Sequence, residues 1–409
     1  MINIKRKILF YSLLLFMVCV FTMFGFSQQQ PIGDLDVDIS VFPDGVTLGT
    51  NSVGTSEHIQ HGLIAETIIE ETGLQVRLLP TSGETERILL LQSGEIDLQT
   101  PNNIVMSWIH AEALLPPFCN KDWGPVPYRV LSMAEHMGQI FMVRGSSDIY
   151  EIADLKGKRV GFYPGSPAMN IFTLAMLAYD NLTFDDVILV DYPNVSAGYQ
   201  GVIEGQIDSC FIGVTANAAY ELDGSRHGIR YLEMFPTYEE GWQRMKAISP
   251  AMEPKLAFIG GGVDRKNPAW TWAAGYPSPT VLDSYPEDKA YNFIKAYFGT
   301  RHIWAEKDES LKENYSMEDN FNMWKNAVVI PYHEGAVRYY KEIGVWTEEY
   351  ENKNNKIIEH QKAVRELWDK SLEEAEEKGI SDEEWPYFWM SKREEAGFYT
   401  LDMDSLMKK

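Results

Sequence analysis

Apolar and polar positions along the chain predict strands and helices in turn. Residues 46–48 form a short β-prone run that leads into a loop containing Gly49 and Gly54, and apolar residues then recur at helical spacing from Ile59 to Ile68. The same order returns in a second copy, at residues 158–163, 164–167 and 171–177. The sequence therefore predicts a unit of strand, glycine loop and helix that is used twice.

Each copy continues in register to two further landmarks. A second polar loop begins at Thr81 in the first copy and at Asn194 in the second, at the same distance from the glycine loop to within one residue. A predicted helix then ends in Gly-x-Ile-Asp, at residues 94–97 and 205–208. Glycine at a helix C-terminus supplies a left-handed cap, and the Ile-Asp that follows starts a buried strand. Three landmarks in register indicate two lobes built on one plan.

Strands that alternate with helices form parallel βαβ units, so we predict an α/β fold with two doubly wound lobes. The first lobe is expected at residues 45–137 and 256–345, and the second at residues 138–255. Two β-prone runs, at residues 139–144 and 255–261, are the expected hinge strands. Ligands in such sheets bind beyond the carboxyl ends of the strands, so the two loop sets should face one cleft.

Residues 346–409 are predicted to form a charged, helical C-terminal extension. Its aromatic residues, among them Trp368, Trp385 and Trp389, should dock on the first lobe while its charges face solvent. The pattern predicts no function for this part.

The N-terminus is typical of an export signal. Lys5, Arg6 and Lys7 precede an apolar run over residues 8–26, and the chain turns polar directly after it. We expect a signal peptide over residues 1–27 and a periplasmic protein, with an uncleaved N-terminal membrane anchor as the alternative.

Composition excludes some classes of partner. The chain has 36 basic and 59 acidic residues and a net charge of -23, so no nucleic-acid partner is expected. Of its 3 cysteines, Cys119 and Cys210 lie outside the leader, and we expect both to be free thiols.

The chain carries no strong catalytic signature. It has neither the Gly-x-Ser-x-Gly motif of serine hydrolases nor the Gly-Lys-Ser/Thr of a phosphate-binding loop. His58 and His61 stand three residues apart beside Glu57, a spacing that a metal could use, but a surface or cleft-rim pair is the favoured interpretation. We therefore predict a binding protein without catalytic residues, cofactor or resident metal.

The loops favour an anion. Backbone N–H groups at helix starts, with hydroxyl groups beside them, could hold a carboxylate, although the same residues could simply cap helices. No single arginine stands out among Arg87, Arg129, Arg144 and Arg338. Trp270, Trp272 and Tyr276 either line the cleft or, as we favour, pack at the lobe junction. The candidate ligand-binding residues are Asn51, Gly54, Thr55, Ser56, His58, Thr81, Ser82, Asn103, Gly165, Ser166, Asn194 and Thr215.

Several motifs, in this order, resemble those of a known family. They are Leu48-Gly49-Thr50, Thr81-Ser82-Gly83-Glu84, Gly94-Glu95-Ile96-Asp97, Asp154-Leu155-Lys156-Gly157-Lys158, Pro164-Gly165-Ser166, Gly205-Gln206-Ile207-Asp208 and His333-Glu334-Gly335-Ala336. Over most of residues 45–345 the chain resembles the TAXI solute receptors of tripartite ATP-independent periplasmic (TRAP) transporters.

The resemblance implies a type II periplasmic binding-protein fold, a glutamate-like or dicarboxylate ligand, and delivery to the membrane permease subunits of a TRAP transporter. The chain departs from the family at Glu57 and His58, where the family commonly has tyrosine, and at residues 98–103, where small residues and an acid are usual. The ligand could therefore differ from glutamate.

We accordingly expect a receptor that captures a small organic acid by hinge closure and performs no chemistry. One alternative is the receptor of an ATP-driven importer of sulfonates or thiamine precursors, whose lobes follow a similar plan. The other is an exported metal-dependent sensor or enzyme that uses His58 and His61.

Overall fold

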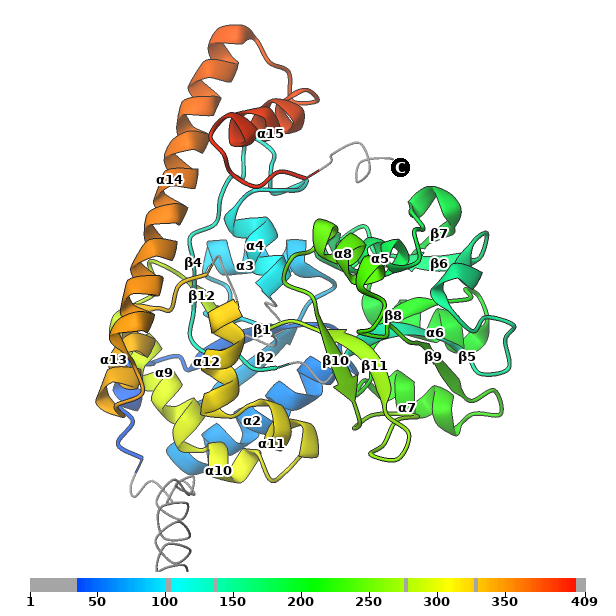
Figure 1. The fold of residues 1–409 in the computed structure, drawn as a ribbon. Helices are drawn as coiled ribbons and strands as arrows, with labels where there is room; N and C mark the ends of the chain where they lie inside the picture. Colours follow the sequence, from blue (N-terminus) through cyan, green and yellow to red (C-terminus); the bar gives the residue numbers. More distant parts are fainter. Residues whose placement is uncertain (1–34, 101–103, 136–137, 276–278, 327–329, 402–409) are drawn as a thin grey trace, which may run out of the picture. The chain divides into compact units, whose positions relative to one another are not determined.

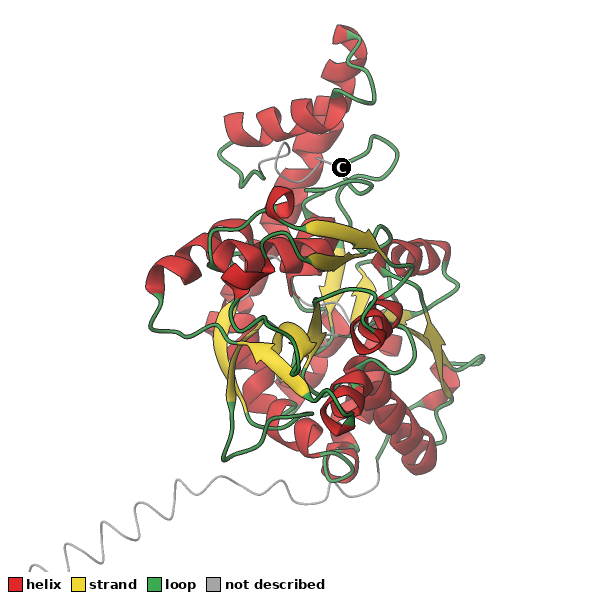
Figure 2. Ribbon diagram, turned by 90° about the vertical axis from the view of Figure 1, so that its right-hand side faces the viewer, coloured by secondary structure: helices red, strands yellow, loops and turns green. Residues whose placement is uncertain are grey.

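The computed structural model describes residues 35–100, 104–135, 138–275, 279–326 and 330–401. The expected signal peptide at residues 1–27 and the candidate residue Asn103 lie outside these ranges. Within them, strands lie between helices on both sides (Figure 2).

The first lobe is built on a five-stranded sheet in the order β2-β1-β3-β12-β4. β1 is parallel to β2 and β3, whereas β12 is antiparallel to β3 and β4. The strands are β1 (Val46–Thr50), β2 (Val76–Pro80), β3 (Leu98–Gln99), β4 (Tyr128–Val130) and β12 (Thr280–Leu282). The helices are η1 (Ile39–Val41), α2 (Ser56–Thr72), α3 (Glu84–Ser93), α4 (Ile104–Ala111), α9 (Glu287–Gly299), α10 (Arg301–Trp304), α11 (Glu309–Asn314), α12 (Met317–Asn326) and α13 (Glu334–Glu342).

The second lobe repeats this order. Its strands are β5 (Gln139–Arg144), β6 (Arg159–Phe162), β7 (Ile188–Asp191), β8 (Cys210–Gly213) and β9 (Ile229–Leu232). β6 is parallel to β7 and is joined to the β8 side by a parallel bridge between Val160 and Ser209, and β5 is antiparallel to both β8 and β9. The order β7-β6-β8-β5-β9 therefore matches β2-β1-β3-β12-β4. The helices are η2 (Ile152–Leu155), α5 (Pro167–Tyr179), η3 (Phe184–Asp186), α6 (Val195–Glu204), α7 (Asn217–Gly224) and α8 (Glu239–Ile248).

The Gly-x-Ile-Asp motif performs the same two tasks in each lobe. Gly94 ends α3 at φ 78° and Gly205 ends α6 at φ 80°, both in the left-handed region that favours glycine. The aspartate then accepts a hydrogen bond from the strand of the glycine-loop unit, β1 or β6: Asp97 Oδ2 from Thr47 N at 2.8 Å, and Asp208 Oδ2 from Arg159 N at 2.8 Å. The motif thus ends a helix and fixes the start of the next strand to its neighbour.

The return of the chain to the first lobe differs from expectation. β10 (Glu253–Ala257) and β11 (Ala269–Ala273) form an antiparallel pair (Figure 1). β11 also pairs with β5, through Trp272 and Gln139. The chain therefore stays on the second sheet past residue 256 and joins the first sheet only at β12. The outgoing and returning segments are bridged by Glu135 and Gly275. The β-prone run at residues 255–261 correctly indicates a strand, but its pattern does not specify the partner strand.

The C-terminal extension consists of α14 (Glu348–Lys378) and α15 (Trp385–Glu395). Trp385 Nε1 donates to the carbonyl of Cys119 at 2.6 Å, and Trp389 Nε1 donates to that of Ala113 at 2.8 Å, so its tryptophans contact the first lobe. Trp368 packs edge-on against both indoles. Beyond α15, the Tyr399 hydroxyl donates to the carbonyl of Ala247 in α8, at 2.9 Å.

This topology is that of a type II periplasmic binding protein. One strand in each lobe runs antiparallel to its neighbours: β12 in the first lobe and β5 in the second. The chain enters that strand directly after it crosses over from the other lobe. Cys119 and Cys210 are buried and free, as expected. Among the described residues, no helix is both long and apolar enough to cross a membrane.

Candidate functional site

The loop between β1 and α2 is shaped by its own hydroxyl groups. Thr55 caps α2: its Oγ1 accepts from His58 N at 3.4 Å and donates to the carbonyl of Ser52 at 2.9 Å. Gly54 has φ 89°, a left-handed conformation that side chains disfavour. Thr55 and Gly54 therefore act first as structural residues that hold the loop at the carboxyl end of β1.

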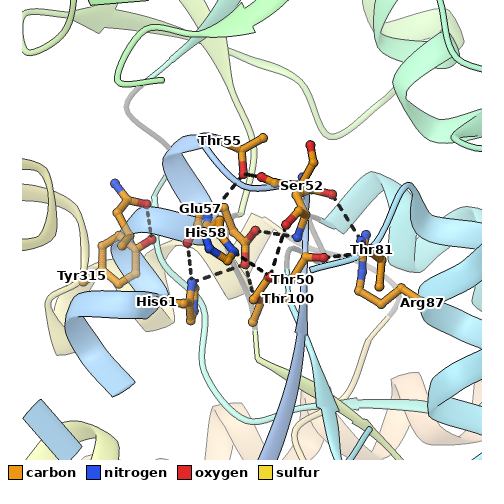
Figure 3. Close-up of polar contacts among 12 residues, drawn as sticks. Thr50, Ser52, Thr55, Glu57, His58, His61, Thr81, Arg87, Thr100 and Tyr315 are labelled. Carbon is orange, nitrogen blue, oxygen red and sulfur yellow. Dashed lines mark hydrogen bonds and ion pairs between the residues drawn. The ribbon is translucent and has the colours of Figure 1, made fainter. Parts of the chain in front are cut away.

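Glu57 lies in the first turn of α2 and is fully buried. Its carboxylate accepts hydrogen bonds from Asn51 N, at 3.0 Å, and from the Thr100 hydroxyl (Figure 3). Burial raises the pKa of Glu57 to about 7, against the lowering effects of Thr100, Asn51 and the charge of Arg87. The start of the first helix thus already carries a carboxyl group of the protein.

The interpretation of His58 and His61 as a surface or cleft-rim pair is wrong for His61, which is buried, and both histidines are engaged within the first lobe. His58 Nδ1 lies 2.9 Å from Thr50 Oγ1, and His61 Nδ1 lies 3.1 Å from the carbonyl oxygen of Glu57. Burial lowers the pKa of both, that of His61 to about 4, so both are neutral at pH 7. Over the described ranges no cluster of three or more His, Cys, Asp or Glu residues is placed to hold a metal ion.

Arg87 of α3 supplies a buried guanidinium to the same cluster. Its Nη1 donates to Asn51 Oδ1 at 3.2 Å and to Thr81 Oγ1 at 2.9 Å (Figure 3). Thr81 in turn donates to the carbonyl of Thr50 at 2.8 Å. The structure therefore brings Asn51 and Thr81 together around a cation that spacing in the sequence did not single out.

The remaining candidates take different roles. Asn194 caps α6, with Oδ1 accepting from Ala197 N at 2.9 Å, whereas exposed Ser82 donates to Glu86 at 2.6 Å. Ser166 is buried at the start of α5 and makes no side-chain cap bond. The hydroxyl oxygens of Ser56 and Thr215 are buried and have no hydrogen-bond partner in the part of the chain that the structure describes.

Loops of the two lobes are in direct contact. Ser52 Oγ lies 3.0 Å from Ser196 Oγ, and Ser196 also donates to the carbonyl of Val53 at 3.1 Å. Asn217 N donates to the carbonyl of Gly54 at 3.3 Å. These contacts bring the loop before α2 beside the starts of α6 and α7, close in sequence to Asn194 and Thr215.

A second contact joins the start of α3 to the start of α5. Glu84 Oε1 accepts a hydrogen bond from Ala168 N at 2.6 Å, and Thr85 N donates to the carbonyl of Gly165 at 3.5 Å. A Cβ atom at Gly83 would lie 2.5 Å from the Gly165 oxygen, so the two backbones meet in a way that only glycine permits. The sequence predicts that Gly165 and Ser166 hold a ligand carboxylate at the start of α5, and in the structure a carboxylate of the protein, that of Glu84, bonds the amide of Ala168 at the same helix start.

Two further polar atoms near the lobe junction have no hydrogen-bond partner among the described residues. They are Gln139 Oε1 and Trp272 Nε1, on directly paired residues of β5 and β11. The Trp272 ring packs against Phe172 of α5, with ring centroids 4.9 Å apart, so it packs within the second lobe. Buried polar atoms are nearly always hydrogen-bonded, so these atoms, with Ser56 and Thr215, can bond a polar solute or water.

Residues 125–248, less than half of the chain, match the family described as NMT1/THI5 like. No curated protein matches the chain.

Several solved structures are similar to the chain. The alkanesulfonate-binding protein SsuA from Xanthomonas axonopodis pv. citri, bound to MOPS, is 14% identical over 80% of this chain and 92% of its own, with a TM-score of 0.41. An ancestral arginine-binding protein bound to arginine is 18% identical over 66% and 95%, with a TM-score of 0.39. The GluR0 ligand-binding core from Nostoc punctiforme, in complex with L-glutamate, is 13% identical over 64% and 98%, with a TM-score of 0.37.

Proposed function

We propose that the protein is an extracytoplasmic solute-binding receptor that encloses a small organic acid between its lobes and delivers it to a membrane permease. The observation that carries the proposal is a pair of lobes whose core strands follow one order and whose loops meet at Ser52 and Ser196. Two segments between the sheets can act as a hinge, and no bond of the solute needs to be made or broken. The type II binding-protein fold supports this function by analogy of fold.

Closure then works as a shift between two populations. A solute that touches both lobes does so only when they are closed, and its binding free energy therefore favours the closed form. Ser56 and Thr215 offer one hydroxyl from each lobe that has no hydrogen-bond partner among the described residues, and Arg87 of the first lobe carries a positive charge against Asn51 and Thr81. Such groups suit an acid that also carries hydrogen-bonding substituents.

The permease partner is proposed from the sequence motifs. They resemble TAXI receptors, so a TRAP permease is the first candidate, reached in the periplasm after export by residues 1–27. The match of residues 125–248 to the NMT1/THI5-like family fits the second candidate, a receptor for an ATP-driven importer of sulfonates or thiamine precursors.

Native mass spectrometry of gently purified protein tests the proposal. We expect a small carboxylic acid to copurify and to restore closure, seen as a smaller radius of gyration, when added back to stripped protein. A sulfonate or a pyrimidine in its place would favour the second candidate. Stoichiometric metal with turnover, and no bound solute, would contradict a receptor function.

A further inference from the structure

At the start of α5, one backbone N–H already donates a hydrogen bond to a carboxylate of the protein itself. Pro167, the first residue of this 13-residue helix, has no N–H, and Ser166 makes no side-chain cap bond. The N–H of Ala168 is donated to Glu84 Oε1 at 2.6 Å. The positive end of the α5 dipole therefore stabilises a carboxylate that comes from the other lobe.

Of the two carboxylate oxygens of Glu84, only Oε1 has a hydrogen-bond partner among the described residues. The side chain of Glu84 is 1% exposed. The basic group of His110 lies close to it, with Nε2 3.9 Å from Oε1. Burial lowers the pKa of His110, so at pH 7 it contributes no positive charge. A buried carboxylate with one oxygen unpaired is held less firmly than one whose two oxygens are both bonded.

The position of Glu84 depends on lobe closure. Gly83 packs directly on Gly165 and Ser166, which brings the next residue onto α5. Since α3 belongs to the first lobe and α5 to the second, the contact joins the two lobes, and the hinge opening proposed above would separate Glu84 from Ala168. With that hinge, the contact is made in the closed form and broken in the open one.

We propose that Glu84 is a built-in competitor for the acid group of the solute. In the unliganded closed form it occupies the start of α5, and an acid that binds there displaces it. This inference rests on the proposed function, because it assumes that the solute is an acid. Binding then exchanges one carboxylate for another, so an acid group alone gains little and the receptor selects solutes with further contacts.

Two variants test the competition. Glu84→Gln keeps the side-chain shape but removes the charge, and Glu84→Ala removes the contact, so the test does not depend on one variant folding. Glu95→Gln is the matched control, because Glu95 is exposed and follows the same helix. Circular dichroism melting establishes that each variant is folded.

Hydrogen exchange of the Ala168 amide in unliganded protein measures the contact. We expect exchange about tenfold faster in both Glu84 variants and unchanged in Glu95→Gln, because a charge-assisted hydrogen bond is lost. Calorimetry with acetate, succinate, L-malate and L-glutamate measures competition. We expect Glu84→Gln to bind about tenfold more tightly every acid that the wild-type protein binds, acetate included.

The outcomes separate this inference from the function on which it rests. If the wild-type protein binds an acid and neither Glu84 variant binds it more tightly, the proposal that Glu84 competes with the solute is wrong, and the receptor function stands. If no protein binds any of the four acids, the acid-binding proposal is contradicted. Exchange at Ala168 that is unchanged in both Glu84 variants would overturn the contact itself.

Discussion

Arg393 of α15 donates a hydrogen bond to the carboxylate of Glu112 at 2.7 Å, and both side chains are buried. Arg393 also donates to the carbonyl of Glu112 at 2.9 Å, and His360 Nε2 lies 2.6 Å from the other carboxylate oxygen. Burial raises the pKa of Glu112, but the hydrogen bond from His360 and the charge of Arg393 outweigh it and leave the pKa below its ordinary value. The extension is therefore fastened to the first lobe by a buried ionic group, and it is part of the folded core.

Arg393→Met should destabilise the protein strongly. Removing one partner of a buried pair leaves the other charge uncompensated, which typically costs about 3–5 kcal/mol. Urea unfolding followed by tryptophan fluorescence measures the loss, and the double variant Arg393→Met/Glu112→Gln should recover a large part of it. Lys378→Met, which removes a surface ion pair with Glu374, is the control and should cost less than about 1 kcal/mol. Equal losses in the two single variants would show that the buried pair has no special role.

Gly83→Ala should impair closure while leaving each lobe folded. The new methyl group would lie 2.5 Å from the Gly165 oxygen and 2.6 Å from Ser166 Oγ, and neither backbone can yield while the lobes are closed. Overpacking of this kind costs about 1–3 kcal/mol, which corresponds to a loss of solute affinity of roughly fivefold to 150-fold.

The measurement is calorimetry with the copurified solute, together with thermal unfolding. Gly62→Ala is the control, because a Cβ atom at Gly62 meets no atom within 4 Å. Unchanged affinity in Gly83→Ala would mean that the contact between residues 83 and 165 is not part of the liganded form.

Ser166→Ala should weaken solute binding without unfolding the protein. The hydroxyl is buried at the start of α5 and makes no cap bond, so its loss should cost about 1 kcal/mol of binding, roughly fivefold in affinity. Calorimetry with the identified solute measures the change, and exposed Ser93→Ala is the control. If affinity is the same in Ser166→Ala and in the wild-type protein, Ser166 does not belong to the binding site.

Local chemistry explains why much of the fold could be predicted from the sequence. The helix ends at Gly94 and Gly205 need a left-handed backbone conformation, which few residues other than glycine adopt. The aspartates that follow must accept a hydrogen bond from a neighbouring strand, which few other side chains can do. The pairing of β11 with β5 could not be predicted in the same way, because a β-prone run states that a strand forms but not which strand it contacts.

The residues of the candidate site also differ in whether local sequence could predict their roles. Thr55 and Asn194 cap helices, as local sequence indicates. In the sequence Glu84 looks like an ordinary acidic residue in the first turn of a helix, and only the folded structure shows its contact with the second lobe. Its contact with Ala168 joins residues far apart in the chain, and no spacing rule reports such a contact. The close approach at Gly83 is the one local signal, since glycine directly before a helix permits another backbone to come near.

The last prediction concerns Glu57 and His61, whose effects on stability oppose each other. The pKa of Glu57 is raised from 4.5 to about 7, so between these pH values the folded protein keeps a proton that the unfolded chain releases. The free energy of unfolding therefore falls as pH rises through this interval, at up to about 1.4 kcal/mol per pH unit.

The pKa of His61 is lowered from 6.5 to about 4, so between these values the unfolded chain holds a proton that the folded protein lacks. This contribution makes the free energy of unfolding rise with pH over the same range. Because the two slopes have opposite sign and similar size, they nearly cancel between pH 4.5 and 6.5 in the wild-type protein.

Single variants should expose each slope. Relative to the wild-type protein, Glu57→Gln loses the contribution that falls with pH, so its stability should rise more steeply from pH 4.5 to 6.5, whereas His61→Gln loses the contribution that rises with pH, so its stability relative to wild type should fall over the same interval. The double variant should lose both contributions. Urea midpoints at half-unit steps of pH measure this, since each titrating group contributes its own slope. Parallel profiles in all four proteins would contradict the raised pKa of Glu57 and the lowered pKa of His61 together, because no other change distinguishes the variants in this interval.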